Sequence, residues 1–576
     1  MAFYLVFILL LVQAYSVLAR CRTPPDAPYF PSASDWAHLD RQVDGRLLQI
    51  TPSAQACREM QDCTSERWMS SSFRSGLPGQ MIYYNWEQDY DSKPPELCLF
   101  NGTVCKQGDV PLFAINATTV HHVQARVGVR FAAKYDLRLS LKSSGHDFLG
   151  RSTARHSLLI WTHYLQHISF HEHYEINGQD FGSAVKVGSG VALKTLYTAA
   201  EEVSKTFVGG VAATVAIGGG YIQGGGHSAI SPLLGLASDN ALEFTVVLAS
   251  GNIVTANEYE HSDLFWALRG GGAGSWGVII SVVLRTFPTF PGVMHLAFFI
   301  LPTSGMVSKA IAIHARKIFA LDTFRTGQYY TIVKDEEYGY RMMVATFFSS
   351  SRPRIVRRLM RSFVQAIKAV GASVLVDDEL MGLPSINSLL TRSDEIGGIN
   401  AILGSRLIPK AAYESHPEEI GQAHKKLLNL GVGIEGCVVA GGKVAENAHI
   451  DSAVNPKWRT AKAHVIAVAL WPDSLSPSDV HALKERMTTE VVPILANMTG
   501  EHDSGAYSNE ADVLEPDFQI TFFGPHYALL SKIKSRYDPH DLFIVPGGVG
   551  SERWRPGGMC TKDHEFRVQE SRGSNS

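Results

Sequence analysis

The segment that most constrains this chain runs from Lys142 to Ser152 and reads KSSGHDFLGRS. The residues before it, 137–141, carry leucine at every second position, which is typical of a half-buried strand. The apolar run 158–161 after it predicts a second strand. Gly145 has no Cβ, so the backbone beside His146 can approach a bulky planar or phosphorylated ligand closely. The pattern predicts a ligand loop between two strands, although a Gly-His-Asp loop alone is more typical of a structural histidine.

Glycine is concentrated between positions 182 and 277. A glycine pair at 209–210 is followed by glycine triplets at 218–220 and 224–226. Consecutive glycines lose much chain entropy on folding, so they are expected where the backbone bends sharply or touches a ligand. This second loop supplies further candidate ligand contacts: Gly219, Gly220, Gly224, Gly225, Gly226 and His227.

The composition excludes several classes of function. The 576 residues are 45% apolar and 19% charged, which is ordinary for a globular protein of two or three domains. The formal net charge of −3 is not that of a nucleic-acid-binding protein, which is typically basic. The one basic stretch, 352–368, has apolar residues at helical spacing, which is typical of a solvated helix face. The cysteines lack metal-ligand spacing, so we expect no metal site.

The N-terminus is typical of a secretory signal peptide. Residues 3–12 are apolar, and Val17 and Ala19 supply small residues for cleavage after Ala19, although no Lys or Arg precedes Arg20. A membrane anchor is the alternative, but this apolar segment is short for a bilayer core of about 30 Å. We expect a protein of the secretory pathway, secreted or held in an endomembrane or vacuolar lumen, with no stable membrane span.

Two further features agree with secretion. N-glycosylation sequons begin at Asn101, Asn116 and Asn497. Five of the seven cysteines fall within residues 21–105, as a disulfide-stapled N-terminal segment would require. Cys98 and Cys105 are the pair that we expect to close a short loop, and the connectivity of the other cysteines stays open.

The hydrophobic pattern changes near Pro288. Before it, short strands and helices alternate with glycine loops, and after it longer amphipathic helices are expected, which indicates a second domain. The last helix has Ser476 as a plausible N-cap and Pro477 at its first position. The expected helices are 123–135, 191–203, 263–268, 306–321, 355–370, 418–430 and 477–492; the expected strands include 185–187, 242–249, 253–255 and 278–284.

Residues 272–277, GAGSWG, match the GxGxxG dinucleotide fingerprint. A Rossmann unit requires a strand before this loop and a helix after it. Here the expected helix precedes the loop and the expected strand follows, so we reject a Rossmann fold.

Taken together, the motifs resemble a known family. Beside the Lys142–Ser152 loop and the glycine loop, the chain has LASDNALE at 236–243, DLFWALRGG at 263–271, YDP at 537–539 and GVGSE at 548–552. It is similar to fungal FAD-linked oxidoreductases of the vanillyl-alcohol oxidase superfamily, in the berberine-bridge-enzyme-like group that includes isoamyl alcohol oxidase. The resemblance covers residues 20–560.

This resemblance implies an α+β fold with a two-part PCMH-type FAD-binding domain and an α/β substrate domain whose sheet is covered by helices. The implied division is a signal peptide (1–19), a disulfide-containing N-terminal segment (20–106), the FAD-binding domain (107–290), the substrate domain (291–500), a berberine-bridge-like segment returning to the FAD domain (501–562) and a polar tail (563–576).

His146 matches the histidine that bonds the 8α-methyl carbon of the flavin in the family, a reaction in which a neutral imidazole acts as nucleophile. Many relatives add a second bond from a cysteine in a Cys-Pro-Thr-Val segment. This chain has AATV at 212–215, so the resemblance implies FAD attached through His146 alone. The other residues expected to contact FAD in the first loop are Lys142, Ser143, Ser144, Gly145, Asp147 and Ser152.

The segment 505–512, GAYSNEAD, resembles the stretch that returns from the substrate domain to the flavin. Tyr507 and Asn509 are therefore expected to lie against the ring system. Tyr507 could act as a catalytic base only if its pKa, ordinarily about 10, were lowered. The sequence itself does not identify the base.

The implied function is an FAD-dependent oxidase of fungal secondary metabolism. It would move a hydride from a small-molecule substrate to FAD, converting an alcohol to a carbonyl or closing a ring, with O₂ as acceptor and H₂O₂ as product. The alternatives are a carbohydrate or oligosaccharide oxidase, and a protein that uses the flavin for non-redox cyclisation or for binding. The intact His146 motif favours the oxidase, because a raised flavin potential matters only for redox chemistry.

Overall fold

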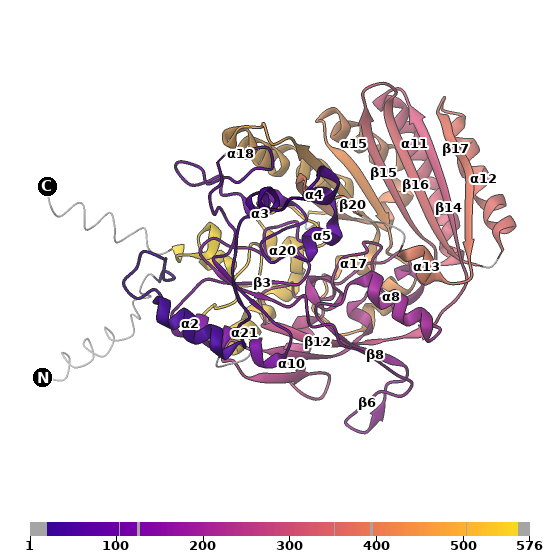
Figure 1. Cartoon of the computed structure of the whole chain (residues 1–576). Helices are drawn as coiled ribbons and strands as arrows, with labels where there is room; N and C mark the ends of the chain where they lie inside the picture. Colours follow the sequence, from indigo (N-terminus) through magenta and orange to yellow (C-terminus); the bar gives the residue numbers. More distant parts are fainter. Residues whose placement is uncertain are drawn as a thin grey trace, which may run out of the picture.

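The computed structural model describes residues 20–562 except 103, 124–126, 351, 392–394 and 503. The expected signal peptide and polar tail lie outside the described residues. Figure 1 shows a large sheet flanked by helices beside a second body that holds two smaller sheets and both ends of the described chain. Within the described residues, no helix is both long and apolar enough to cross a membrane.

The first small sheet carries the histidine loop. Its strand order is β1-β2-β4-β3, and β2, β4 and β3 are parallel. Helix α7 (Gly128–Lys134) connects β2 to β3 and shares a buried apolar cluster with them. It is shorter than the expected helix 123–135, part of which lies outside the described residues. The strands are β1 (Leu47–Gln49), β2 (Phe113–Asn116), β3 (Leu139–Lys142) and β4 (Leu158–Trp161).

The second small sheet is antiparallel, in the order β11-β10-β12-β8-β5. The expected hairpin is confirmed as β10 paired with β11. Helix α10 (Ser262–Leu268) precedes the GAGSWG loop and β12 follows it, which confirms that no Rossmann unit is present there. The elements are β5 (Ile168–His171), β8 (Ala184–Gly188), β10 (Ala241–Val247), β11 (Ile253–Ala256), β12 (Val278–Arg285) and helix α8 (Leu193–Glu202).

The large sheet has seven antiparallel strands in the order β17-β14-β16-β15-β19-β20-β18. Helices α11, α12 and α15 cover one face, where their apolar side chains share a core cluster with alternate strand residues. The strands are β14 (Gly292–Leu301), β15 (Gly327–Asp335), β16 (Gly339–Ser349), β17 (Ser373–Leu383), β18 (Asn400–Pro409), β19 (Gly433–Val438) and β20 (Ala461–Trp471); the helices are α11 (Ser304–Lys317), α12 (Pro353–Lys368) and α15 (Pro417–Asn429). The expected α+β class, with a helix-covered second sheet, is confirmed.

Helix α18 begins where capping chemistry predicts. The Ser476 hydroxyl accepts the backbone N–H of Asp479, which confirms Ser476 as the N-cap of α18 (Pro477–Arg486). The helix expected over 477–492 is confirmed, but it continues to Thr499 and contains a π-helical turn at Met487–Val491, between α18 and α19 (Val492–Thr499). Pro493 has no N–H to donate to the preceding turn, so the regular hydrogen-bond ladder is interrupted there.

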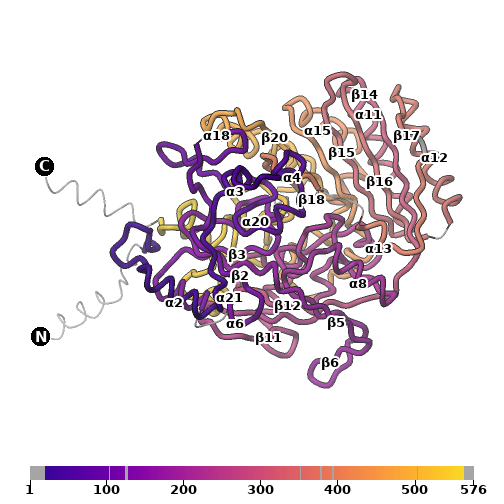
Figure 2. Tube along the Cα trace, in the orientation of Figure 1, coloured from indigo at the N-terminus to yellow at the C-terminus, as the bar shows by residue number. Residues whose placement is uncertain are grey.

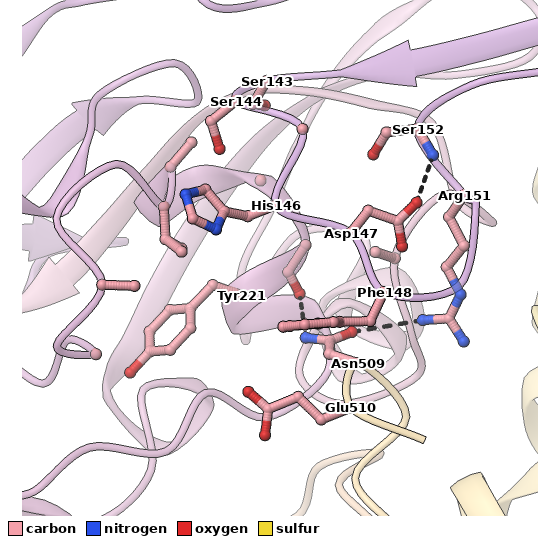
Figure 3. Close-up of a pocket in the computed structure, with 18 of the residues that line it drawn as sticks. Ser143, Ser144, His146, Asp147, Phe148, Arg151, Ser152, Tyr221, Asn509 and Glu510 are labelled. Atoms are coloured by element: carbon pink, nitrogen blue, oxygen red, sulfur yellow. Dashed lines mark hydrogen bonds between the residues drawn. The ribbon is translucent and has the colours of Figure 1, made fainter. Parts of the chain in front are cut away.

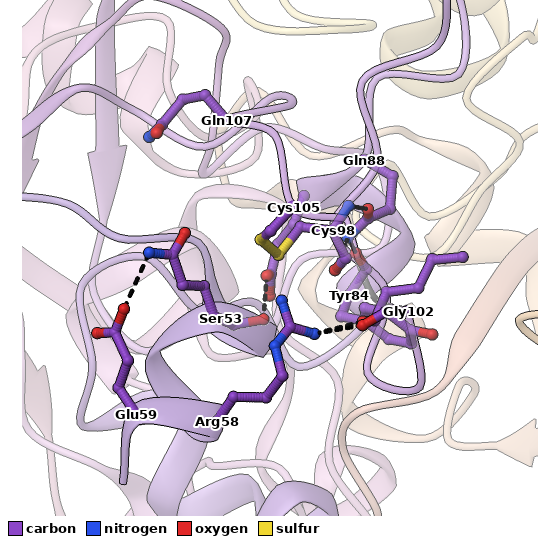
Figure 4. Close-up of a disulfide and its surroundings, with 12 residues drawn as sticks. Ser53, Arg58, Glu59, Tyr84, Gln88, Cys98, Gly102, Cys105 and Gln107 are labelled. Carbon is purple, nitrogen blue, oxygen red and sulfur yellow. Dashed lines mark hydrogen bonds between the residues drawn. A yellow bond between two sulfur atoms is a disulfide. The ribbon is translucent and has the colours of Figure 1, made fainter.

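Three disulfides join the cysteines. Cys98 is bonded to Cys105, as expected (Figure 4). Cys57 is bonded to Cys63, also in the N-terminal segment. The third bond joins Cys21 to Cys560, 539 positions away. Figure 2 shows the indigo N-terminal and yellow C-terminal segments together at one side of the molecule. The C-terminal segment is therefore covalently closed onto the start of the described chain.

Candidate active site

A cavity of about 440 Å³ lies between the small-sheet body and the uncovered face of the seven-stranded sheet. Its size is within the range of cofactor and small-molecule sites. The histidine loop, the glycine loop, the 273–279 segment, the large sheet and the C-terminal segment all contribute to its wall. Figure 3 shows His146 on one side of this space and Asn509 and Glu510 on another. Residues that are far apart in the sequence thus meet at one site.

The histidine loop is shaped by Asp147. Its carboxylate accepts the backbone N–H of Leu149 at 3.0 Å and that of Ser152 at 2.8 Å, which closes the turn after His146 (Figure 3). Burial raises the pKa of Asp147, opposed by the charge of Arg151 and by these N–H donors. Gly145 has φ +86°, a conformation that favours glycine. Asp147 and Ser152 line the cavity and also hold the loop in shape.

His146 is nearly buried, with 5% of its side chain exposed. Its Nε2 is hydrogen-bonded to the Thr214 hydroxyl, from the segment before the glycine loop. Its Nδ1 lies 3.1 Å from the Glu395 carboxylate, which also lines the cavity. Thr214 therefore holds the imidazole ring through Nε2, and Nδ1 faces the Glu395 carboxylate in the cavity wall.

Lys142 connects this loop to the N-terminal segment. Its ammonium donates to the backbone carbonyls of Leu77 at 2.6 Å, Pro78 at 3.2 Å and Gln80. Burial lowers the pKa of Lys142 to about 7. The neighbouring Ser143 hydroxyl is hydrogen-bonded to the Thr162 hydroxyl at 2.8 Å, and Ser144 also lines the cavity.

The two glycine triplets differ in their position relative to the cavity. Gly218, Gly219 and Gly220 line the cavity, where a Cβ at Gly218 would lie 2.8 Å from the Ser189 Cα. Gly224, Gly225 and Gly226 are not among the described residues that line it. A Cβ at Gly224 would lie 2.4 Å from the Asn509 amide nitrogen, so the second triplet lets the C-terminal segment pack closely. His227, which follows it, does line the cavity.

Asn509 joins the C-terminal segment to both loops. Its amide nitrogen donates to the Gly220 carbonyl at 3.0 Å and to the Tyr507 hydroxyl at 2.9 Å. Its amide oxygen accepts from Arg151 at 3.5 Å (Figure 3). Tyr507 lines the cavity, as expected, but burial raises its pKa. Because an acceptor of protons must be available unprotonated, this shift disfavours Tyr507 as a base.

Three carboxylates that line the cavity were not predicted as site residues from the sequence: Glu395, Glu435 and Glu510. The carboxylate oxygen Oε2 of Glu510 is hydrogen-bonded to Nε2 of His227 at 3.2 Å and to Nε2 of His464 at 3.0 Å. Burial alone would raise the pKa of Glu510, but the two imidazoles outweigh it and hold that pKa below its usual range. Burial lowers the pKa of His464. The alternation of side chains along β19 and β20 is the only sequence signal that could have placed Glu435 and His464 on one face of the sheet. Their interaction partners could not be predicted, because these lie in distant segments of the chain.

The cavity fits a large ligand with planar and polar parts. Side-chain atoms that lie buried in its wall without a hydrogen-bond partner among the described residues include Ser189 Oγ, Gln223 Oε1 and Arg151 Nη2. Buried polar groups are normally hydrogen-bonded, so these atoms indicate a missing polar ligand. The glycine wall would admit a ring system or a pyrophosphate without side-chain obstruction. These features fit FAD. The described residues hold no group of three or more His, Cys, Asp or Glu that could bind a metal ion.

Comparisons with known proteins agree with this geometry. Residues 111–257 match the family described as FAD binding domain, and residues 506–550 match the family described as berberine and berberine like. The two matches contain His146 and Asn509, respectively.

Several fungal proteins are similar to this chain over almost its whole length. The chain is 38% identical to an "uncharacterized FAD-linked oxidoreductase" of Arthroderma benhamiae, over 94% of this chain and 96% of that one. It is 33% identical to FAD-linked oxidoreductase notD' of Aspergillus versicolor, over 94% and 90%. Among solved structures, the VAO-type flavoprotein MtVAO615 of Myceliophthora thermophila C1 superposes with a TM-score of 0.81 at 26% identity, over 94% and 100%. The chain therefore belongs to the FAD-linked oxidoreductases of the vanillyl-alcohol oxidase and berberine-bridge-like family.

Proposed function

We propose that this enzyme is an oxidase whose FAD is attached through His146 alone. The position of His146 carries the proposal, because Thr214 occupies Nε2 and leaves Nδ1 directed at the cavity-lining Glu395. Ala212, where many relatives have a cysteine, lines the cavity and has no thiol. The one free cysteine, Cys437, is not among the cavity-lining residues.

Bound FAD supplies the acceptor for a hydride from the substrate. The residues of the chain hold the reactants in place: His146 would anchor the cofactor, and Asn509 and Arg151 tie the C-terminal segment to the flavin loops. The proposed reaction is oxidation of a small molecule of fungal secondary metabolism, from alcohol to carbonyl or by ring closure. O₂ then takes two electrons and two protons and leaves as H₂O₂.

Apolar side chains in the cavity wall favour a compact substrate that is largely apolar. Leu403, Ile466 and Val468 of the large sheet line it. These side chains support a small metabolite with an apolar part as the substrate.

We also propose that the protein matures in the secretory pathway. Three disulfides support this location, because such bonds form and persist in oxidising compartments.

Two measurements test the proposed function. Peptide mapping should find one flavin-modified peptide, containing His146, and acid precipitation should leave the flavin with the protein. Anaerobic mixing with fungal alcohol metabolites should bleach the flavin, and air should restore it with one H₂O₂ per turnover. Flavin released by acid would contradict the attachment. Slow reoxidation in air would indicate a dehydrogenase, and no bleaching by any metabolite would favour non-redox cyclisation or binding.

A further inference from the structure

Strand β20 lines the cavity with three alternate residues that differ steeply in exposure. Ile466 is 3% exposed, Val468 is half-buried, and Leu470 is 61% exposed. Alternate residues of a strand point to the same face and the strand rises by about 3.3 Å per residue, so this β20 row is about 13 Å long. The cavity therefore runs along β20 from a buried end at Ile466 to an open end at Leu470.

The neighbouring strand β18 repeats this pattern. Leu403 pairs with Val468 and Ala401 pairs with Leu470, and both β18 residues line the cavity. Ile399, two positions before Ala401 and just before the strand begins, lines it as well and is half-buried. The two strands thus form a continuous apolar surface that extends from the inside of the cavity to its open end.

The N-terminal segment extends this surface beyond the edge of the sheet. The side-chain oxygen of Asn85 accepts the backbone N–H of Ala401 at 3.0 Å, which holds the segment along β18, the last strand of the sheet. Tyr83 and Phe148 pack against each other with ring centroids 4.3 Å apart, and both line the cavity. They share an apolar cluster with Ala401 and Ile399. Aromatic side chains therefore continue the apolar wall that the two strands begin.

Polar groups on this face of the sheet lie at the buried end of the β20 row. Glu435 on β19 lines the cavity and pairs with Ile466, the most buried member of the row. His464, two positions before Ile466, is fully buried and hydrogen-bonded to Glu510. A ligand that lies against the sheet thus meets polar side chains near Ile466 and apolar ones from there to Leu470.

A single exposed leucine needs no special explanation, because isolated apolar residues are common on protein surfaces. Leu470 differs, since it is the outermost member of a continuous apolar row in a cavity wall. The groups that fit FAD, among them His146 and the first glycine triplet, belong to the small-sheet body on the other side of the cavity. The β20 row is therefore available to the substrate.

We propose that the substrate is an alcohol with a short apolar tail, bound with its hydroxyl end inside at Ile466 and its tail along Val468 toward Leu470. This inference rests on the proposed oxidase function. It makes the length of the tail the property that the cavity selects, because each methylene that the row removes from water strengthens binding by at most about fourfold.

Tertiary alcohols test the tail without turnover, because their carbinol carbon has no hydrogen that could leave as hydride. The probes are the dimethylcarbinols with an ethyl, a butyl or a hexyl tail, and the flavin spectrum of the oxidised holoenzyme reports their dissociation constants. In wild type, affinity should rise at least about threefold with each added pair of methylenes. Equal affinity for the three probes, or no binding by any of them, overturns the inference.

Two serine variants locate the tail. Leu470→Ser should lose most of the gain in affinity between the butyl and the hexyl probe, whereas Leu375→Ser should keep it. Leu375 is the matched control, because it is 64% exposed on β17, the opposite edge strand of the same sheet, and is not among the described residues that line the cavity. If Leu470→Ser binds all three probes like wild type, or weakens the ethyl probe as much as the hexyl probe, the tail does not run toward Leu470 and the inference fails.

Anaerobic flavin reduction by primary alcohols separates this inference from the oxidase function. Butanol, hexanol and octanol should reduce the flavin at half-saturating concentrations that fall as the chain lengthens. If all three bleach the flavin at the same half-saturating concentration, the oxidase function stands and the inference fails. If none bleaches it, the proposed oxidation of alcohols fails, and the carbinol affinities alone decide whether the cavity holds an apolar tail toward Leu470.

Discussion

The Thr214 hydroxyl is hydrogen-bonded to Nε2 of His146, across 68 positions of sequence. It lies two residues after Ala212, which takes the place of the cysteine found in many relatives. The same short segment that cannot supply a second flavin bond therefore orients the residue proposed to make the first.

Replacing Thr214 by valine should impair attachment of the flavin. The buried Nε2 would lose its partner, at a free-energy cost of about 1–3 kcal/mol, and the ring would no longer be held with Nδ1 toward the cavity. The fraction of protein that keeps flavin after acid precipitation should fall well below that of wild type. Thr214→Ser retains the hydroxyl and serves as the matched control; if both variants flavinylate like wild type, Thr214 does not orient His146.

Glu510→Gln should destabilise the protein near neutral pH. The variant removes the charge that the His227 and His464 imidazoles surround, and we expect a decrease in unfolding free energy of about 1–3 kcal/mol. Because the folded pKa of Glu510 lies below its ordinary 4.5, the charge stabilises wild type above pH 4.5, and this contribution is lost as the pH falls further. Melting temperatures of the two proteins should therefore differ most near pH 7 and converge in acid. A difference that does not change with pH would show that the charge is not responsible.

Removal of the Cys21–Cys560 disulfide should lower thermal stability more than removal of Cys57–Cys63. The first bond closes a loop of 539 positions and the second one of 6, and the entropy that a cross-link removes from the unfolded chain grows with loop length. The double serine variant at Cys21 and Cys560 should lose about 2–5 kcal/mol. Melting temperatures of the two double variants, measured in parallel, check the order, and equal losses would contradict it.

N-glycans should occupy Asn101 and Asn497 but not Asn116. The first two side chains are exposed, whereas Asn116 lies on β2 with its side-chain oxygen buried. In a secreting fungal host, Asn101→Gln and Asn497→Gln should each remove one glycosidase-sensitive step in gel mobility. Asn116→Gln should remove none. A protein without any glycosidase-sensitive shift would contradict passage through the secretory pathway.

Much of the fold could be predicted from the sequence because its signals are local. Residues 158–161 form β4 as expected, since a short apolar run needs no distant partner to be identified as a buried strand. Ser476 and Pro477 mark the start of α18 by capping chemistry alone. The π-helical turn at Met487–Val491 could not be predicted in this way, because the apolar spacing continues through it while Pro493 removes one N–H donor from the ladder.

The sequence by itself determined the two loops that meet at the cavity, since KSSGHD and the glycine triplets carry their conformational requirements in their own residues. Only the tertiary structure decided what surrounds them. Glu435 faces the cavity because β19 lies between β15 and β20, and a strand presents alternate residues to opposite faces. The pKa of Glu510 is held below its usual range because strand β20 and the second glycine triplet bring His464 and His227 to it. Pairings of this kind depend on strand order and on contacts across hundreds of residues, which no local pattern in the sequence records.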